Sequence, residues 1–149
     1  MTNGLSLTQR NIRPAKGQAA FLPNQPIIHN CIASEALMAG DIVTFATTEL
    51  TDATVLKKAA TTDLPCGVVV YNAIKSGFVA NDKISIFPVN SFVYMPAGYA
   101  NLTIGSKVAF NSDGQVVAAD SGDNTIGILW TQPAAIGDMV VVQVAPVVA

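Results

Sequence analysis

The chain has 149 residues, of which 50% are apolar and only 12% are charged. Intrinsic disorder is excluded, because disordered chains combine low hydrophobicity with high charge. No apolar run reaches the length of about 18 residues that a membrane-spanning helix needs, and residues 1–20 lack the apolar core of a signal peptide. We therefore expect one compact domain without a membrane partner, whose excess of apolar residues is available for an interface.

The charges are divided unevenly along the chain. Residues 1–30 hold Arg10, Arg13 and Lys16 and no acid, a net charge of +3, whereas residues 31–149 hold five lysines and ten acids, a net charge of −5. An acidic body disfavours nucleic acid as a partner, and three basic residues are too few for a nucleic-acid-binding tail. We expect no nucleic-acid partner.

Residues 1–26 are predicted to form an extended N-terminal arm. Pro14, Pro23 and Pro26 bias the residues before them toward extended backbone, and the segment shows no sustained helical or strand periodicity. Two interpretations stay open: a tail or strand that caps the domain, or an arm that becomes ordered on a partner. The side chains available for contact with a partner are Leu5, Leu7, Arg10, Arg13, Lys16, Phe21 and Leu22.

Residues 27–149 are predicted to form a single all-β domain, a compact sandwich or barrel of short, mostly antiparallel strands. Val, Ile and Thr account for 17, 12 and 12 residues, and β-branched side chains suit a pleated surface. Only single helical turns are expected, near Ser34–Met38 and Ala97–Leu102. The predicted strands are Ile27–Ala33, Asp41–Ala46, Thr54–Ala59, Gly67–Asn72, Lys83–Val89, Ser91–Met95, Lys107–Asn111, Gln115–Ala119, Thr125–Trp130 and Asp138–Ala145.

A turn pattern recurs four times at the start of a strand. A Gly or Asn able to adopt positive φ precedes an Asp or Ser that can hydrogen-bond the turning backbone. The four pairs are Gly40-Asp41, Asn81-Asp82, Gly105-Ser106 and Gly137-Asp138. The pattern predicts one strand–loop–turn–strand unit that occurs twice, although such turns also recur in β proteins without a repeat. Separately, Asp113-Gly114 predicts a type I′ hairpin.

The residues that could carry chemistry do not form a recognisable catalytic or metal-binding pattern. His29 is the only histidine and is expected on the same strand face as Cys31, without a third group to orient the pair. Cys31 and Cys66 are expected to be free thiols, and Asp120–Asn124 is expected to be a solvated loop rather than a calcium site. Phe92, Tyr94 and Tyr99 suit packing better than a sugar-stacking platform. We predict no enzyme, no cofactor and no metal.

The order of short motifs along the body resembles a known family. A Gly-Asp-x-Val strand is followed by Gly-Val-Val-Val, Ile-Gly-Ser-x-Val, Asp-Gly-Gln-Val, Ile-Gly-Ile-Leu and a final Gly-Asp-x-Val-Val-Val. From Ala36 to Val144, this succession resembles the small capsid decoration, or cement, proteins of tailed bacteriophages. The longer proline-containing N-terminal segment departs from that pattern.

The resemblance implies a virion structural protein, made in the host cytoplasm, that binds the outer surface of the assembled capsid. It implies the major capsid protein as partner, whose subunits it would bridge, and a homo-oligomer, with a trimer favoured over a dimer. The arm would then contact the capsid or a neighbouring copy. A carbohydrate- or receptor-binding β module of a virion surface or fibre is the main alternative, and a small hydrolase is a third class that stays open.

Overall fold

The computed structural model describes residues 14–22, 24–46, 54–75 and 77–147. Within these ranges the protein is all-β and contains no helix, which confirms the predicted fold class. The strands are β1 (Ile28–Ala33), β2 (Leu37–Met38), β3 (Ile42–Phe45), β4 (Val55–Lys58), β5 (Gly67–Val69), β6 (Gly77–Phe78), β7 (Lys83–Phe87), β8 (Phe92–Pro96), β9 (Lys107–Phe110), β10 (Val116–Ala118), β11 (Thr125–Leu129) and β12 (Met139–Val147).

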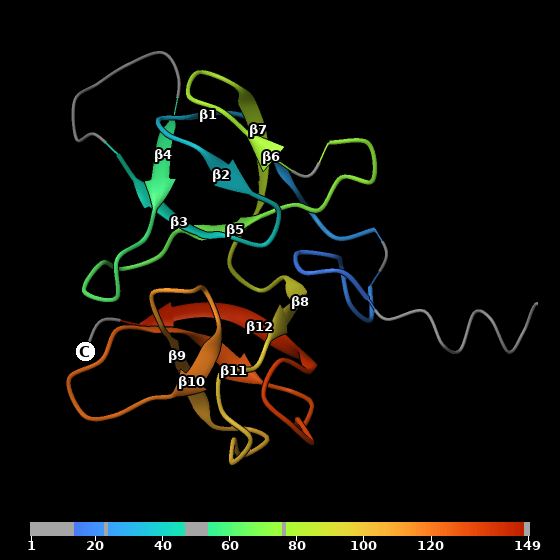
Figure 1. The fold of residues 1–149 in the computed structure, drawn as a ribbon, viewed down its shortest axis with the longest axis vertical. Helices are drawn as coiled ribbons and strands as arrows, with labels where there is room; N and C mark the ends of the chain where they lie inside the picture. Colours follow the sequence, from blue (N-terminus) through green and yellow to red (C-terminus); the bar gives the residue numbers. More distant parts are fainter. Residues whose placement is uncertain (1–13, 23, 47–53, 76, 148–149) are drawn as a thin grey trace, which may run out of the picture.

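The strands form two lobes, which lie one above the other in Figure 1. In the N-terminal lobe, the strand order β1-β4-β3-β5-β7 closes into a barrel in which only the β1–β4 pair is parallel. A small separate sheet pairs β2 with β6. In the C-terminal lobe, the order is β10-β9-β11-β12-β8, and every pair is antiparallel. A parallel bridge between Ala97 and Val116 then brings the end of β8 to β10.

The two lobes are therefore two versions of one strand arrangement. Strands β1, β3, β4, β5 and β7 correspond to β8, β9, β10, β11 and β12, in the same order and with the same directions. The hydrogen-bonded partners also agree residue by residue. Corresponding pairs are Ala33–Leu56 and Ala97–Val116, Val43–Gly67 and Val108–Gly127, and Val69–Ile86 and Leu129–Val142.

Equivalent positions fill the interior of each lobe. All of these side chains are buried, because alternate residues of each strand point inward. In the N-terminal lobe they are Cys31, Ala33, Leu37, Val43, Leu56, Val69, Ile84 and Ile86, and in the C-terminal lobe Met95, Ala97, Leu102, Val108, Val116, Leu129, Val140 and Val142. The two interiors therefore share positions while they differ in side-chain shape.

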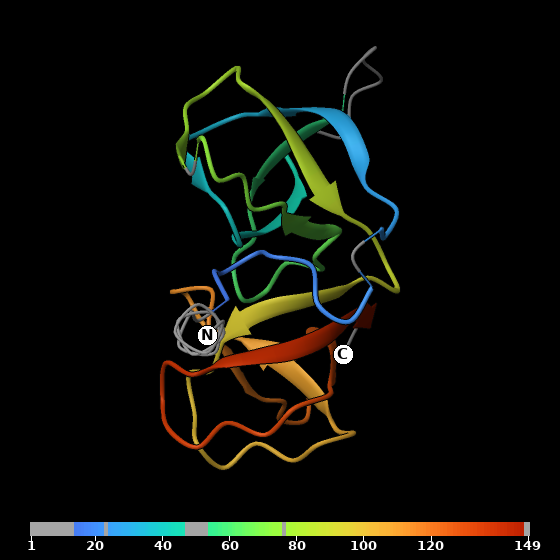
Figure 2. The ribbon, with the colours of Figure 1, turned by 90° about the vertical axis from the view of Figure 1, so that its right-hand side faces the viewer.

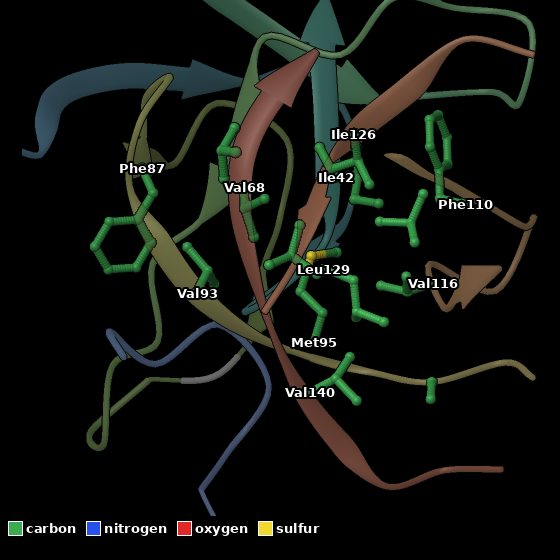
Figure 3. Close-up of a cluster of buried hydrophobic side chains, with 14 of the residues drawn as sticks. Ile42, Val68, Phe87, Val93, Met95, Phe110, Val116, Ile126, Leu129 and Val140 are labelled. Carbon is green, nitrogen blue, oxygen red and sulfur yellow. The ribbon is translucent and has the colours of Figure 1, made fainter. Parts of the chain in front are cut away.

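One wall of the N-terminal lobe packs against the C-terminal lobe. Neighbouring strands place Ile42, Val68 and Phe87 in one row on the outside of the barrel, and these side chains are at most 2% exposed. The row joins the core of the C-terminal lobe at Val93, Phe110, Ile126 and Val144, and Figure 3 shows part of this shared cluster. The shared cluster makes the contact between the lobes apolar.

The four recurrent turns have the predicted geometry. Gly40, Asn81, Gly105 and Gly137 all have positive φ, between 74° and 92°. In the first turn, the Asp41 N–H donates to the Met38 carbonyl and the Asp41 carboxylate accepts from the Met38 N–H. The turns before β7 and β12 repeat both bonds, and in the turn before β9 the Ser106 hydroxyl donates to the Thr103 carbonyl. Two turns belong to each lobe, as the twofold unit requires.

Each recurrent turn also forms a bulge against a partner strand. At Gly40, the amide donates to the Val69 carbonyl, while the Val69 amide donates to the carbonyl of the next residue, Asp41. Two residues of the turn thus oppose one residue of the partner, with the first in a left-handed conformation, which defines a G1 bulge. The same reciprocal bonds join Asn81 and Asp82 to Ala33, Gly105 and Ser106 to Leu129, and Gly137 and Asp138 to Ala97.

Three local predictions are wrong. The single helical turns expected near Ser34–Met38 and Ala97–Leu102 are absent, and β2 occupies part of the first range. The hairpin between β9 and β10 exists, but Gly114 alone has positive φ there, with Asp113 in an ordinary conformation. A type I′ turn would need both residues in the left-handed region, so the loop is instead a longer one that ends in a left-handed glycine.

The N-terminal segment from residue 15 to residue 20 runs along the free edge of β8, and we call it the strap. The Ala20 N–H donates to the Phe92 carbonyl, the Gly17 N–H donates to the Tyr94 carbonyl, and the Tyr94 N–H donates to the Gln18 carbonyl. The strap also reaches the other lobe, because the Gly17 carbonyl accepts from the Tyr71 amide. Figure 2 shows this segment in blue between the two lobes. Residues 15–20 therefore belong to the fold, which agrees with the interpretation that this part of the segment caps the domain.

Candidate functional site

Of the seven arm residues singled out in the sequence, Lys16, Phe21 and Leu22 lie in the part of the chain that the structure describes. Lys16 makes an ion pair with Asp41, with 3.5 Å between Nζ and Oδ1. Because its stem also lies against Gly40, this lysine ties the strap to the N-terminal lobe. The Lys16 side chain therefore contacts groups of the same chain. Leu5, Leu7, Arg10 and Arg13 lie outside the described residues.

Phe21 and Leu22 follow the strap and remain 54% exposed. Phe21 has a φ of 61°, and the Leu22 N–H donates to the Ala20 carbonyl at 2.5 Å, which makes a strained γ-turn. This turn places the Phe21 ring against Phe92 and Trp130, and the three ring centroids lie 5.1–6.0 Å apart. We call Phe21, Phe92 and Trp130 the aromatic cluster. It is an exposed apolar feature that the sequence had not indicated as a unit.

Gln25 anchors the chain just after the aromatic cluster. Its side-chain amide accepts from the Phe92 N–H and donates to the Phe92 carbonyl, the latter at 2.8 Å. The side chain thus replaces a missing strand partner at the edge of β8, since a primary amide offers the same donor and acceptor as a peptide group. Gln25 is 9% exposed, so the cost of leaving these backbone groups unpaired would be high.

His29 and Cys31 do not form a pair, so the prediction that they share one strand face is wrong. Asn30 between them has a φ of 63°, and the β1–β7 register shifts between Ile28 and Cys31. Cys31 points into the barrel core, whereas exposed His29 bonds through Nδ1 to the Ser85 hydroxyl at 2.9 Å. The bulge breaks the two-residue alternation on which the prediction depended.

Cys31 and Cys66 are free thiols, as expected. Burial raises the pKa of the Cys31 thiol, and burial together with the nearby Cys31 raises the pKa of Cys66 to about 11. Thiolates are the reactive form of cysteine, so both side chains are poor nucleophiles at neutral pH.

The acidic side chains of the described residues serve mainly as turn acceptors. Asp82 also pairs with Lys75 at 2.8 Å, and this hydrogen bond lowers the pKa of its carboxyl group. Within the described ranges, no group of three or more His, Cys, Asp or Glu side chains could hold a metal ion. No helix in these ranges is long and apolar enough to cross a membrane.

One end of the C-terminal lobe carries exposed apolar turn tips. Ile104 and Ile136 occupy the same position of two recurrent turns, and they are 54% and 65% exposed. Because β9 and β12 both run antiparallel to β11, the turns that precede them lie at the same end of the sheet. Pro14, where the described chain begins, lines a hollow with Gly137 and Asp138 beside the second turn. We call Ile104, Ile136 and Pro14 the docking end.

The architecture defined by these observations is a pair of related five-stranded β lobes joined by a strap. No protein-family model matches the sequence, and no curated protein matches it. Among solved structures, the fold is similar to the head fiber gp8.5 N base in bacteriophage phi29, with a TM-score of 0.58 and 18% identity. The likeness covers 80% of this chain and 95% of that chain, so nearly all of the head fiber base has a counterpart here.

Proposed function

We propose that this protein is a structural component of a tailed-phage virion that binds the outer surface of the assembled capsid. In this proposal it bridges subunits of the major capsid protein, is made in the host cytoplasm and acts by binding rather than by catalysis. The observation that carries the proposal is the likeness to a phage head fiber base over 95% of that chain. The motif order of the sequence supports the same class independently, since it resembles capsid decoration proteins.

The docking end is the surface we propose to face the capsid. Ile104 and Ile136 occupy positions where the N-terminal lobe has Ala39 and Ala80, so the C-terminal lobe alone places large apolar side chains there. Full burial of an isoleucine side chain stabilises a contact by about 1.5–3 kcal/mol. Residues 1–13 precede Pro14 at this end, and they add Leu5, Leu7, Arg10 and Arg13 as further proposed contacts.

We propose that the protein is a homo-oligomer on the capsid, with a trimer favoured over a dimer. An exposed, valine-rich edge strand would favour association between copies. The valine-rich β12 is not such an edge, because it lies between β11 and β8. Support comes instead from large apolar side chains of the N-terminal lobe that are more than half exposed, among them Met38, Phe45 and Val79.

Co-sedimentation with empty shells of the phage that encodes the protein tests the proposal. The full chain is expected to sediment with the shells, whereas the double variant Ile104→Asp with Ile136→Asp and the deletion of residues 1–13 are expected to bind more weakly. The matched control is Ile74→Asp, because Ile74 is 95% exposed on the other lobe. Failure of the full chain to bind shells would overturn the proposal, and unchanged binding by the double variant would exclude the docking end.

A further inference from the structure

The two lobes differ most in one row of outward-facing side chains. In the N-terminal lobe, the row of Ile42, Val68 and Phe87 is sealed against the other lobe. The register places Lys107, Ile128 and Gln143 at the equivalent positions, where Lys107 is exposed and the other two are half-buried. Phe92 pairs with Gln143 and extends this row across a fourth strand. We call Lys107, Ile128, Gln143 and Phe92 the open row.

The aromatic cluster lies at one end of the open row. Phe92 belongs to both, and the Trp130 indole N–H donates to Gln143 Oε1 at 3.1 Å. Exposed ring faces attract flat apolar surfaces, while the remaining N–H groups of the Gln143 amide are hydrogen-bond donors. This end therefore offers stacking and hydrogen bonding side by side, without any charged group among Phe21, Phe92, Trp130 and Gln143.

A polar hollow of about 490 Å³ lies at the other end of the open row. Thr125 lines it and is only 5% exposed, yet Thr125 Oγ1 has no hydrogen-bond partner among the residues that the structure describes. The accessible surface of this oxygen is below 1 Å², so it is buried in the lobe and an occupant of the hollow does not reach it. The polar side chains of the lining are Ser106, Lys107, Asp120, Ser121, Asp123 and Thr125.

The same loop in the N-terminal lobe shows that this polarity is not needed for the fold. There the Asp63 carboxylate accepts from the Ala60 N–H at 2.9 Å, as the Asp123 carboxylate accepts from the Asp120 N–H. The loop shape is thus kept, but the N-terminal lobe has Ala60 and Pro65 where the C-terminal lobe has Asp120 and Thr125. The polar groups at positions 120 and 125 are therefore not required for the shape of this loop.

We propose that the open row binds a neutral oligosaccharide, with one sugar stacked on the aromatic cluster and another in the polar hollow. Sugar hydroxyl groups both donate and accept, which matches a lining that mixes carboxylates with an ammonium and hydroxyl groups. The row crosses four strands, about 14 Å at a strand spacing of about 4.8 Å, which requires more than a single sugar.

The chemistry of the row disfavours two other occupants. Lys107 in the lining repels a metal cation, and one Asp123 oxygen already accepts from a backbone amide. A dry contact with another β lobe would bury Lys107 and Gln143, whose counterparts Ile42 and Phe87 are apolar, and burial of unpaired polar groups is costly.

Fluorescence of Trp130 tests the proposal directly, because it is the only tryptophan in the chain. The full chain is titrated with mono- and trisaccharides of glucose, galactose and N-acetylglucosamine. We expect a saturable change in emission with at least one series, and tighter binding of the trisaccharide than of its monosaccharide. Absence of binding by every series would overturn the proposal.

Variants separate the two ends of the row. Trp130→Ala is expected to weaken binding, which saccharide-observed magnetic resonance measures in the absence of the tryptophan. The double variant Asp120→Asn with Ser121→Ala, in the lining of the hollow, is also expected to weaken binding. Ile74→Ala and Asp113→Asn are the controls, because both residues are exposed outside the row. Unchanged affinity in both sets of row variants would overturn the proposal. So would loss of binding in EDTA with recovery in calcium, or a Trp130→Ala effect confined to the oligomeric state.

Discussion

The two lobes share a hydrogen-bond scaffold but differ on their outer walls. Both use the same strand order, the same bulged turns and the same eight interior positions. On the outside, Phe87 of one lobe is buried in the contact with its neighbour, whereas its counterpart Gln143 lies beside an exposed tryptophan. The comparison shows that turns and interior side chains determine this fold, while the outer wall is free to take a different role in each lobe.

The largest expected effect comes from replacing an outer residue of each lobe, Phe87 or its counterpart Gln143, by alanine. Phe87→Ala should lower the free energy of unfolding by about 3–5 kcal/mol, because it leaves a cavity between the lobes. Gln143→Ala should cost about 1 kcal/mol, since it removes mainly the hydrogen bond to Trp130. Urea denaturation of both variants measures the difference. Equal losses at the two positions would contradict the assignment of one wall as buried and the other as open.

Equivalent glycines provide the second test. A Cβ atom at Gly127 would lie 1.9 Å from the Gln143 carbonyl oxygen, and at Gly67 it would lie 2.6 Å from that of Phe87. Gly127→Ala should therefore cost about 3 kcal/mol of unfolding free energy, and Gly67→Ala somewhat less. Thermal unfolding of both, with Gly77→Ala as a control in open space, measures this order. A harmless Gly127→Ala would show that the β11–β12 approach is looser than the structure indicates.

The strap is expected to contribute an intermediate amount. Gln25→Ala removes both bonds to the Phe92 backbone and should cost about 1–3 kcal/mol, because buried donors and acceptors are left unpaired. Hydrogen exchange at the Phe92 amide should accelerate in the variant, and the exposed Gln132→Ala serves as the control. If exchange at Phe92 is unchanged, the side chain of Gln25 does not hold the edge of β8.

The smallest expected effects concern the recurrent turns. Gly105→Ala should cost about 1–2 kcal/mol, because an L-residue is strained at its φ of 85° although no atom obstructs the new methyl group. Asn81 is the one residue other than glycine at this position of the four turns. Asn81→Gly should change the free energy of unfolding by less than about 1 kcal/mol. Chemical denaturation of both variants measures the pair. A larger loss in Asn81→Gly than in Gly105→Ala would show that the four turns are not equivalent.

Much of the architecture could be predicted because it depends on local signals. Each of the ten predicted strands overlaps an observed strand, and the four turn pairs have the expected positive φ. The strands β2 and β6 were missed because two residues carry no periodicity. The full correspondence between the two lobes can be recognised only from the hydrogen-bond register. Equivalent strands such as β7 and β12 are both apolar but do not have the same residues.

The candidate sites were less predictable, because they depend on contacts between distant segments. Phe21, Phe92 and Trp130 are far apart in the sequence, and only the strap brings the first to the other two. The pair Gly17-Gln18 is a sequence signal for the strap. In the structure Gly17 has a φ of 85°, and Gln18 bonds to Ala15 through both its backbone and its side chain, as in the recurrent turns. The pattern is hard to recognise in the sequence, because Gln18 stands where the other turns have Asp or Ser.

The strap also determines how a mechanical load would enter the molecule. A pull applied through residues 1–13 reaches Pro14 first and then runs along the strap, whose backbone lies antiparallel to β8. The bonds of Gly17, Gln18 and Ala20 to this strand would then be loaded together rather than one after another. The link from Gly17 to Tyr71 and the ion pair of Lys16 pass part of that force to the other lobe. A tether fastened at the N-terminus would therefore strain both lobes at once instead of peeling one away from the other.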